Sequence, residues 1–287
     1  MATSTNAYAK INLTLDITGR REDGYHLLRM VMQSVSLCDR LTLNEGDRGI
    51  RILCGRADVP CDESNTAYKA AAAFFAFSGT EPHIAIEIEK NIPSQAGLGG
   101  GSADAAAVLH ALNKMYRTGY SKQTLCEIGV RVGADVPFCV LGGTALAEGI
   151  GEKLTALPPL PCCFLVICKP PVGVDTKNAY ALADSAGTAG MHTDAVLRAV
   201  RSGDLHAVSE HLGNDFERVI QLDDVTRIKQ LMKSTGALGA CMTGSGSAVY
   251  GIFEKEAVAR ACRSTLAQSF SEVFLCEPVN DVSCALG

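Results

Sequence analysis

Apolar and polar residues alternate over residues 8–18 of this chain. The apolar members face one way and the polar members face the other, which is the period of a β-strand with one buried face. We therefore expect a half-buried strand here, with its polar side chains turned away from the core. The apolar positions are Ile11, Leu13, Leu15 and Ile17, and the polar positions are Lys10, Asn12, Thr14 and Asp16.

Further strands and helices follow without strict alternation, which favours an α+β fold over a doubly wound sheet. Apolar runs predict strands over 30–37, 40–43, 50–53, 84–88, 142–146, 163–168 and 273–277, and a glycine turn entering a strand within 240–253. Helices are predicted over 65–77, 103–113, 121–132 (capped by Ser121), 193–201, 205–212, 225–234 and 258–270. The sequence Pro158-Pro159-Leu160-Pro161 predicts a boundary between domains at 1–155 and 156–287.

The charge and the cysteine content exclude several classes of function. The net charge is −5 over 287 residues, whereas general binding to nucleic acids or membrane surfaces requires a basic face. The N-terminus lacks the pattern of a signal peptide, and no apolar run reaches the ~18 residues of a membrane span. Twelve cysteines occur without a Cys-x-x-Cys pair, which indicates reduced thiols rather than zinc ligands or disulfides. We expect a cytoplasmic protein that acts on a small molecule, and the sequence carries no signal for an oligomeric state.

The densest local signal is the loop Pro93-Ser94-Gln95-Ala96-Gly97-Leu98-Gly99-Gly100-Gly101-Ser102-Ala103-Asp104-Ala105. Glycines let a backbone approach a ligand with its N–H groups turned inward, and a following helix adds a partial positive charge. Together they predict an anion cradle, most simply for a nucleotide phosphate. The loop lacks the usual Gly-Lys-Ser/Thr, and Ser102 stands where the dinucleotide fingerprint has Gly or Ala. A flexible linker is the alternative, but it does not explain the Ala-rich helix that follows.

Three side chains are candidates for phosphoryl transfer, each with an ordinary structural alternative. Ser102 could cap the helix after the loop or place its hydroxyl near Mg²⁺. Asp135, in Gly133-Ala134-Asp135-Val136-Pro137, is a candidate general base or a solvated turn residue. Lys10 could balance charge on a transferring group or lie on the surface. The residues alone leave these alternatives open.

The order of four motifs resembles that of the GHMP kinases, the superfamily of galacto-, homoserine, mevalonate and phosphomevalonate kinases. These motifs are Tyr8-Ala9-Lys10-Ile11-Asn12-Leu13, the glycine loop, the segment around Asp135, and Met242-Thr243-Gly244-Ser245-Gly246-Ser247. Two more, Gly19-Arg20-Arg21-Glu22-Asp23-Gly24-Tyr25-His26 and Ala147-Glu148-Gly149-Ile150-Gly151-Glu152, resemble the branch whose substrate is methylerythritol joined to cytidine diphosphate.

The resemblance implies a two-domain GHMP-kinase fold with the active site in the interdomain cleft, using ATP and Mg²⁺ to phosphorylate the substrate's 2-hydroxyl. Asp135 would accept or orient the hydroxyl proton, and Lys10 would keep that carboxylate ionised. The implied ATP-binding residues are Asn65, Lys90, Pro93, Gly97, Leu98, Gly99, Gly100, Gly101, Ser102, Ala103 and Asp104, with Ser102 also a Mg²⁺ ligand. The implied substrate-binding residues are Asn12, Tyr25, His26, Thr176, Tyr180, Gly244 and Ser245, with Tyr180 stacking opposite Tyr25.

Two other interpretations are open at this point. A GHMP kinase for another small alcohol, such as homoserine or a mevalonate derivative, would have little use for stacking rings at Tyr25 and Tyr180. A nucleotide-sensing protein that keeps the fold without catalysis would not need both Lys10 and Asp135. Cytidine competition distinguishes the first alternative, and acceptor-dependent ADP release distinguishes the second.

Overall fold

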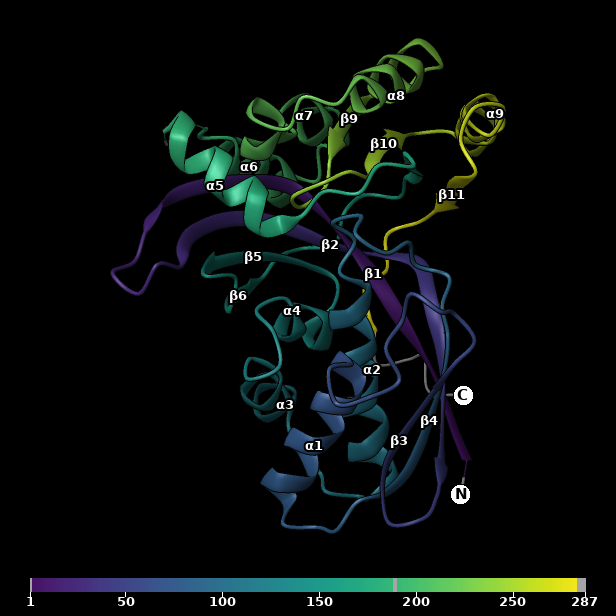
Figure 1. Cartoon of the computed structure of the whole chain (residues 1–287). Coiled ribbons are helices and arrows are strands. Elements are labelled where there is room, and N and C mark those ends of the chain that lie inside the picture. Colours follow the sequence, from purple (N-terminus) through teal and green to yellow (C-terminus); the bar gives the residue numbers. More distant parts are fainter. Residues whose placement is uncertain (1, 188–189, 283–287) are drawn as a thin grey trace.

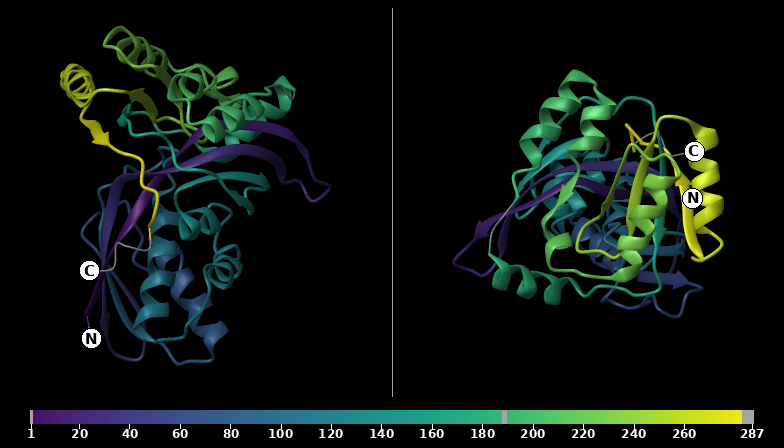
Figure 2. Two further views of the ribbon diagram at one scale, coloured as in Figure 1. Left: turned by 180° about the vertical axis from the view of Figure 1, so that it is seen from behind. Right: turned by 90° about the horizontal axis from the view of Figure 1, so that it is seen from above.

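The computed structural model describes residues 2–187 and 190–282, which form two halves that meet along one long hairpin (Figures 1 and 2). In the described residues, the first half is built on a seven-stranded sheet of order β3-β4-β2-β1-β8, with β5 on β2 and β6 on β5. Its strands are β1 (Ala2–Arg20), β2 (His26–Glu45), β3 (Gly49–Cys54), β4 (His83–Glu89), β5 (Thr144–Gly149), β6 (Lys153–Ala156) and β8 (Gly213–Asn214).

The hairpin of β1 and β2 extends through both halves of the molecule. The segments predicted as two strands, 30–37 and 40–43, belong to the single strand β2, because a register shift opposite Tyr8 and Lys10 absorbs the irregularity without ending the ladder. The expectation of a half-buried β1 was wrong, since every residue from Ala9 to Ile17 is buried. Alternation shows that one face of β1 is apolar and the other polar. It does not show that the second half of the chain covers the polar face.

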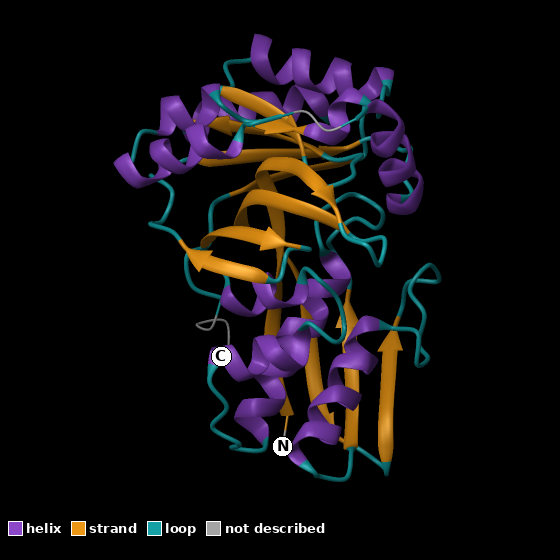
Figure 3. Cartoon of the chain, turned by 90° about the vertical axis from the view of Figure 1, so that its left-hand side faces the viewer, coloured by secondary structure: helices purple, strands orange, loops and turns teal. Residues whose placement is uncertain are grey.

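Helices cover one face of the first sheet (Figure 3). They are α1 (Thr66–Ser78), α2 (Gly100–Met115), α3 (Lys122–Gly129) and α4 (Val136–Leu141). Ser121 caps α3 as predicted, because its side chain accepts a hydrogen bond from the N–H of Thr124. Phe74 of α1 is completely buried, and its ring contacts three other aromatic rings, those of Phe75, Tyr116 and Tyr120. This packing holds α1 against the C-terminal end of α2.

The second half has its own sheet, of order β11-β7-β10-β9 in the described residues. Its elements are β7 (Phe164–Lys169), α5 (Thr176–Ala186), α6 (Thr193–Ser202), α7 (Leu205–Glu210), the 3-10 helix η1 (Asp215–Arg218), α8 (Asp223–Ser234), β9 (Gly239–Met242), β10 (Val249–Phe253), α9 (Glu256–Leu266) and β11 (Glu272–Cys276). The short strand β8 crosses to the first sheet and pairs in parallel with β1 at Thr14 and Leu15. The halves are therefore joined by backbone pairing as well as by packing.

The α+β prediction is confirmed, and each predicted helix has a counterpart in the structure. Strands β6 and β8 were not predicted because four and two residues are too few to show a period. The second sheet begins at Phe164, after β6 ends at Ala156, and the domain boundary at 155/156 stays a prediction. The cysteines among the described residues are free thiols, and no helix in the described ranges is long and apolar enough to cross a membrane.

Replacing Phe74 with alanine is expected to lower the free energy of unfolding by about 3–5 kcal/mol, because a fully buried ring leaves a cavity. Phe77 on the same helix is the matched control, since its side chain is 43% exposed and its removal should cost less than about 1.5 kcal/mol. Urea unfolding of both variants measures the difference. If both variants lost the same free energy of unfolding, the burial of Phe74 would not explain the stability of the α1–α2 contact.

Candidate active site

A cavity of about 490 Å³ lies between the two halves. The glycine loop forms one wall, β1 and β2 form the floor, and residues of α5, η1 and the turn after β9 form the opposite wall. The expected site residues that line it are Lys10, Asn12, Asn65, Lys90, Pro93, Gly97, Leu98, Gly99, Gly100, Gly101, Asp104, Asp135, Thr176, Tyr180, Gly244 and Ser245. Four expected residues, Ser102, Ala103, Tyr25 and His26, are not part of this lining.

The glycine loop leads directly into helix α2, which begins earlier than the sequence predicted. The N-cap is Gly99, in the left-handed conformation with φ 69°, and no side chain caps the helix. Ser102 therefore lies in the first turn and is not the cap, because glycine reaches this conformation without strain. The first helical hydrogen bond joins the N–H of Ala103 to the carbonyl of Gly99, so the preceding N–H groups of the first turn have no partner within the helix. They form a site for an anion at the positive end of α2.

Close approach of other chain segments explains why the loop must be glycine. A Cβ on Gly97 would lie 2.1 Å from the carbonyl oxygen of Thr243, and φ at Gly97 is 73°. A Cβ on Gly99 would lie 3.0 Å from the side chain of Lys10. The two glycine motifs, which lie about 150 residues apart in sequence, thus contact each other through backbone. The resulting cradle of bare backbone fits the phosphates of a nucleotide.

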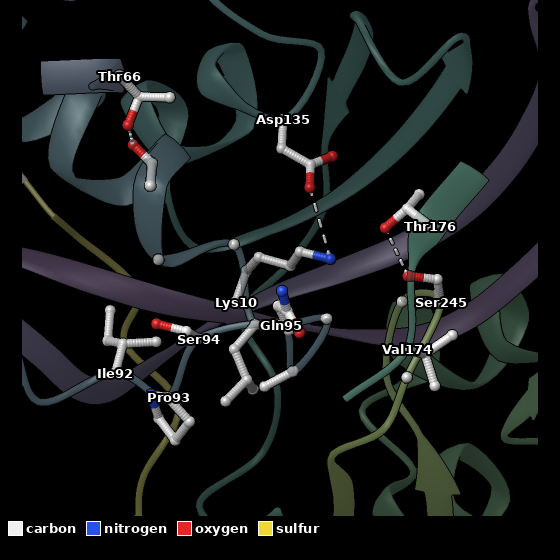
Figure 4. A pocket seen from close by; sticks show the side chains of 18 of the residues that line it. Lys10, Thr66, Ile92, Pro93, Ser94, Gln95, Asp135, Val174, Thr176 and Ser245 are labelled. Carbon is white, nitrogen blue, oxygen red and sulfur yellow. Dashed lines mark hydrogen bonds and ion pairs between the residues drawn. The ribbon is translucent and has the colours of Figure 1, made fainter. Parts of the chain in front are cut away.

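Lys10 and Asp135 point toward each other across the cavity (Figure 4), with 3.6 Å between Nζ and Oδ2. The Lys10 side chain is 5% exposed and that of Asp135 is 33% exposed. Asp135 is the N-cap residue of α4, yet its carboxylate makes no capping hydrogen bond. The carboxylate therefore remains able to bind a proton from a ligand, while the buried lysine balances its charge.

Asn12 connects this pair to the second glycine motif. Its Oδ1 accepts hydrogen bonds from Lys10 Nζ at 2.8 Å and from the N–H of Gly244 at 3.0 Å. Its own N–H donates to Thr243 Oγ1, and its carbonyl accepts from the Tyr250 hydroxyl. Asn12 was expected to bond near the acceptor; the contacts in the structure orient Lys10 and hold the turn of Gly244 against β1.

Lys90 sits between two buried carboxylates at the other end of the cavity. Its Nζ forms ion pairs with Asp39 and, at 2.7 Å, with Oδ2 of Asp104, and all three side chains are at most 6% exposed. Burial raises the pKa of Asp104 to about 8, an effect that Lys90 opposes and Asp39 reinforces. Asp104 Oδ1 is buried without a hydrogen-bond partner among the described residues. One ammonium thus faces two carboxyl groups, and Asp104 keeps its proton to a higher pH than an exposed aspartate does.

Asp39 was missed by the sequence analysis. Its Oδ1 accepts hydrogen bonds from the N–H groups of Asn91 and Ile92 at 2.6 and 2.8 Å, which fixes the start of the glycine loop. In the sequence it is a charged residue between the two apolar segments predicted as strands, which is an ordinary context. Asn65 also has a structural role. Its side chain caps α1 by accepting a hydrogen bond from the N–H of Ala67, and the same residue lines the cavity.

The aromatic wall differs from the expected arrangement. The ring stacked on Tyr180 is that of His26, with centroids 4.4 Å apart and 17° between planes, whereas Tyr25 is 60% exposed. Successive side chains of an extended segment point to opposite sides, so only one of these neighbours reaches Tyr180. Thr176, the first residue of α5, shares a hydrogen bond of 2.9 Å with Ser245 (Figure 4).

The protein oxygens near the cradle would suit a Mg²⁺ ion that has few protein ligands. The hydroxyl of Ser102 lies in the first turn of α2, next to Gly133 of the segment that carries Asp135. Mg²⁺ usually keeps several waters and takes one or two protein oxygens besides substrate phosphates. Within the described ranges, the group of three metal-ligating side chains is Asp16, His192 and Asp215, outside the cavity lining. A Mg²⁺ ion at this place would therefore be held mainly by phosphate.

Replacing Gly97 with alanine is expected to weaken nucleotide binding at least tenfold, because the added methyl group meets the Thr243 carbonyl and forces the two glycine motifs apart. Gly79 is the matched control: φ is 68° there too, but a Cβ would meet nothing within 4 Å. Titration calorimetry with ATP measures both. If Gly79→Ala weakens ATP binding as much, the close approach at Gly97 is not the reason for the glycine.

The shared ammonium predicts a pH dependence of stability. Asp104 holds its proton in the folded protein up to a pKa of about 8, whereas the unfolded chain releases it near pH 4. The folded state thus binds more protons between these values, and stability falls as pH rises through that window. Asp104→Asn should flatten this slope in urea unfolding between pH 5 and pH 8. The exposed Asp223→Asn is the control, and unchanged slopes in both variants would contradict the prediction.

Comparisons with known proteins agree with this geometry. Residues 65–143 match the family model described as GHMP kinases N terminal domain, and residues 196–272 match GHMP kinases C terminal. A 4-diphosphocytidyl-2-C-methyl-D-erythritol kinase of Clostridium botulinum (strain Eklund 17B / Type B) is 42% identical over 273 residues, covering 94% of this chain and 97% of that protein. One of Desulfitobacterium hafniense (strain Y51) is 48% identical over 255 residues, covering 87% of each.

Solved structures give the same result for the fold. A crystal structure of 4-(cytidine 5'-diphospho)-2C-methyl-D-erythritol kinase superposes with a TM-score of 0.83 at 32% identity, covering 97% of this chain and 100% of that one. A homoserine kinase of Cytophaga hutchinsonii superposes with a TM-score of 0.78 at 19% identity, covering 97% and 95%, which is a likeness of fold alone. The chain is therefore a small-molecule kinase of the ATP-dependent GHMP superfamily, and it belongs to the family of the 4-diphosphocytidyl-2-C-methyl-D-erythritol kinases.

Proposed function

We propose that this chain transfers the γ-phosphoryl group of ATP to the 2-hydroxyl of 4-diphosphocytidyl-2-C-methyl-D-erythritol, giving the 2-phosphate and ADP. The reaction would be a cytoplasmic step in the non-mevalonate synthesis of isoprenoid precursors. The observation that carries the proposal is the pairing of Lys10 with Asp135, 3.6 Å apart, in the same cavity as the glycine cradle. An anion site and a carboxylate that reaches a hydroxyl are the two parts that phosphoryl transfer to an alcohol requires.

The residues at the centre of the cavity would act as follows. Asp135 orients the acceptor hydroxyl and takes its proton as the phosphoryl group arrives. Lys10 balances the carboxylate and offsets charge on the transferring group. Asn12 holds the lysine in place through the hydrogen bond from Nζ to Oδ1. These three side chains lie on β1 and at the start of α4.

The two ends of the cavity would bind the two substrates. The glycine loop would bind the ATP phosphates through backbone N–H groups, with Asn65, Lys90 and Asp104 near the nucleoside. Bound Mg²⁺ would neutralise phosphate charge, with the Ser102 hydroxyl as its protein ligand. Thr176, Tyr180, Gly244 and Ser245 line the opposite end, where the cytidine diphosphate portion would lie. Tyr25 and His26 would complete that end from the start of β2.

Asp135→Asn is expected to lower kcat by ~10²–10⁴-fold while ATP affinity changes little, because the amide cannot take the proton. Asp47→Asn, in the turn between β2 and β3, serves as the matched control and should leave kcat unchanged. A coupled assay of ADP release and calorimetry with ATP give the two quantities. Near-normal turnover of Asp135→Asn would remove the aspartate from the mechanism.

The substrate is tested by acceptor-dependent ADP release. With 4-diphosphocytidyl-2-C-methyl-D-erythritol as acceptor, we expect turnover that cytidine nucleotides inhibit competitively. Homoserine and mevalonate, tried in parallel, should give none, since they offer no base to the wall at Tyr180. Turnover with those alcohols and none with the cytidine-linked acceptor would replace the proposal by that of another GHMP kinase. ATP binding without turnover on any acceptor would favour a nucleotide-sensing protein.

A further inference from the structure

Three side chains that can bind a metal ion meet outside the main cavity, where the second half of the chain docks against β1. They are Asp16 of β1, His192 at the N-cap of α6, and Asp215, the first residue of η1. One oxygen of each carboxylate and one ring nitrogen of the histidine all lie within 4.8 Å of one another. Ligand atoms of a tetrahedral Zn²⁺ lie ~3.5 Å apart, so each side chain would need to move by less than about 1 Å.

The carboxylate of Asp215 is buried, and one of its oxygens has no partner. The side chain is 4% exposed, and Oδ2 accepts a hydrogen bond from the N–H of Ile17 at 2.8 Å. Oδ1 has no hydrogen-bond partner among the described residues. Arg218 of the same short helix donates instead to the carbonyls of Ala186 and Gly187. Because a buried acceptor without a partner is costly, Oδ1 is a ready ligand for a cation.

Asp16 is buried next to this carboxylate, with 3% of the residue exposed. Its two oxygens accept hydrogen bonds from the N–H groups of His192 and Thr193, at 3.2 and 3.0 Å. A carboxylate offers about four lone pairs, so each oxygen of Asp16 keeps one for a further partner. Burial raises the pKa of Asp215, and the charge of Asp16 acts in the same direction. A divalent cation between the two carboxylates would remove their repulsion.

The imidazole of His192 lies in a space that glycine leaves open. A Cβ on Gly213 of β8 would lie 2.2 Å from Cγ of the ring, and a Cβ on Gly190 would lie 2.2 Å from Oδ1 of Asp215. Among residues 2–187 and 190–282, His192 donates a hydrogen bond through its backbone N–H, and its ring nitrogens have no such partner. A nitrogen lone pair of the neutral ring is therefore available to a metal ion.

We propose that Asp16, His192 and Asp215 bind a divalent transition-metal ion such as Zn²⁺. One imidazole nitrogen and two carboxylate oxygens suit Zn²⁺, whereas Mg²⁺ and Ca²⁺ prefer oxygen ligands alone. The two carboxylates also balance the charge of the ion. Asp215 lines a second cavity of about 180 Å³, which offers a route to the cluster. This inference goes beyond the kinase reaction and does not depend on it.

The ion would hold the two halves of the chain together. It would join β1 to the start of α6, which lies along the hairpin (Figure 1), and to η1. Phe216, which follows Asp215, lines the main cavity and packs edge-on against Tyr180 with ring centroids 4.9 Å apart. Zn²⁺ should therefore stabilise the docked halves and this wall of the cavity.

Calorimetry with ZnCl₂ on the metal-free full chain tests the site. Nucleotide is left out, because Mg²⁺ at the cradle would be held mainly by phosphate. We expect one Zn²⁺ per chain and a higher midpoint of thermal unfolding when Zn²⁺ is present. Asp215→Asn, which keeps an acceptor for the N–H of Ile17, and His192→Gln should each weaken binding by roughly tenfold or more. His206→Gln is the matched control, since that side chain is 62% exposed, and it should bind Zn²⁺ like the wild type.

Cobalt identifies the ligands without any variant. The chain has twelve cysteines, and thiolates also bind Zn²⁺. Co²⁺ at the proposed site should show only the weak visible absorption of nitrogen and oxygen ligands. A strong charge-transfer band in the near ultraviolet would show that cysteine thiolates bind the metal.

Three results would overturn the proposal. The first is a folded wild type that binds no Zn²⁺, and the second is a thiolate band with Co²⁺. The third is equal Zn²⁺ affinity in the wild type and Asp215→Asn, which would show an adventitious ion only. Circular dichroism of the metal-free variants shows whether they fold; if a variant does not, the cobalt spectrum of the wild type decides. None of these results bears on the kinase reaction, whose residues line the main cavity.

Discussion

The polar face of β1 is the constraint on which the rest of the structure depends. Its polar side chains, Lys10, Asn12, Thr14 and Asp16, are all buried. Buried polar groups are costly unless they find hydrogen-bond partners, and the second half of the chain supplies most of them. Thr14 bonds Thr193, and Asp16 accepts from the N–H groups of His192 and Thr193. Removing the second half would leave this face unsatisfied, so the two halves must dock, and their docking creates the cavity.

The same docking explains the chemistry of the loops. Asn12 can hold Lys10 in place only because Thr243 and Gly244 lie against it, and those residues fit only because Gly97 has no side chain. Three motifs far apart in sequence are thus fixed by one another's backbone. A lysine held on a buried strand is positioned more precisely than one on a mobile loop.

The positions of helices and strands were predicted better than the residues that pack against them. Alternation along 8–18 located β1, but a period of two carries no information about what covers each face, so the burial of Lys10 was not foreseen. The helix after the glycine loop was expected, with Ser102 as one candidate for its cap. Gly99 takes that place because the turn into α2 needs the left-handed conformation, φ 69°, and because the side chain of Lys10 packs closely against it. Tertiary contacts overrode the local signal in both cases.

Two long-range ion pairs, those made by Asp39 and Asp184, were not expected from the sequence. Asp39 and Asp184 stand in unremarkable contexts, and their partners Lys90 and His26 are 51 and 158 residues away. Motif resemblance pointed to Lys90 and His26 because those residues recur with their neighbours in order. The resemblance could not indicate the carboxylates that contact Lys90 and His26, because these carboxylates lie in other segments. Only the fold brings them together. The residues that position a site were therefore harder to predict than the residues that form it.

Electrostatic balance in the cavity gives the last physical constraint. The chain carries a net charge of −5, and both lysines that line the cavity are already paired, Lys10 with Asp135 and Lys90 with Asp39 and Asp104. A triphosphate therefore meets little uncompensated positive charge from these side chains. The backbone N–H groups of the loop and the N-terminus of α2 are the other sources of positive charge at the cradle. Backbone N–H groups reach an anion only where no side chain covers them, which the glycines of this loop allow although it lacks the lysine found in other phosphate-binding loops.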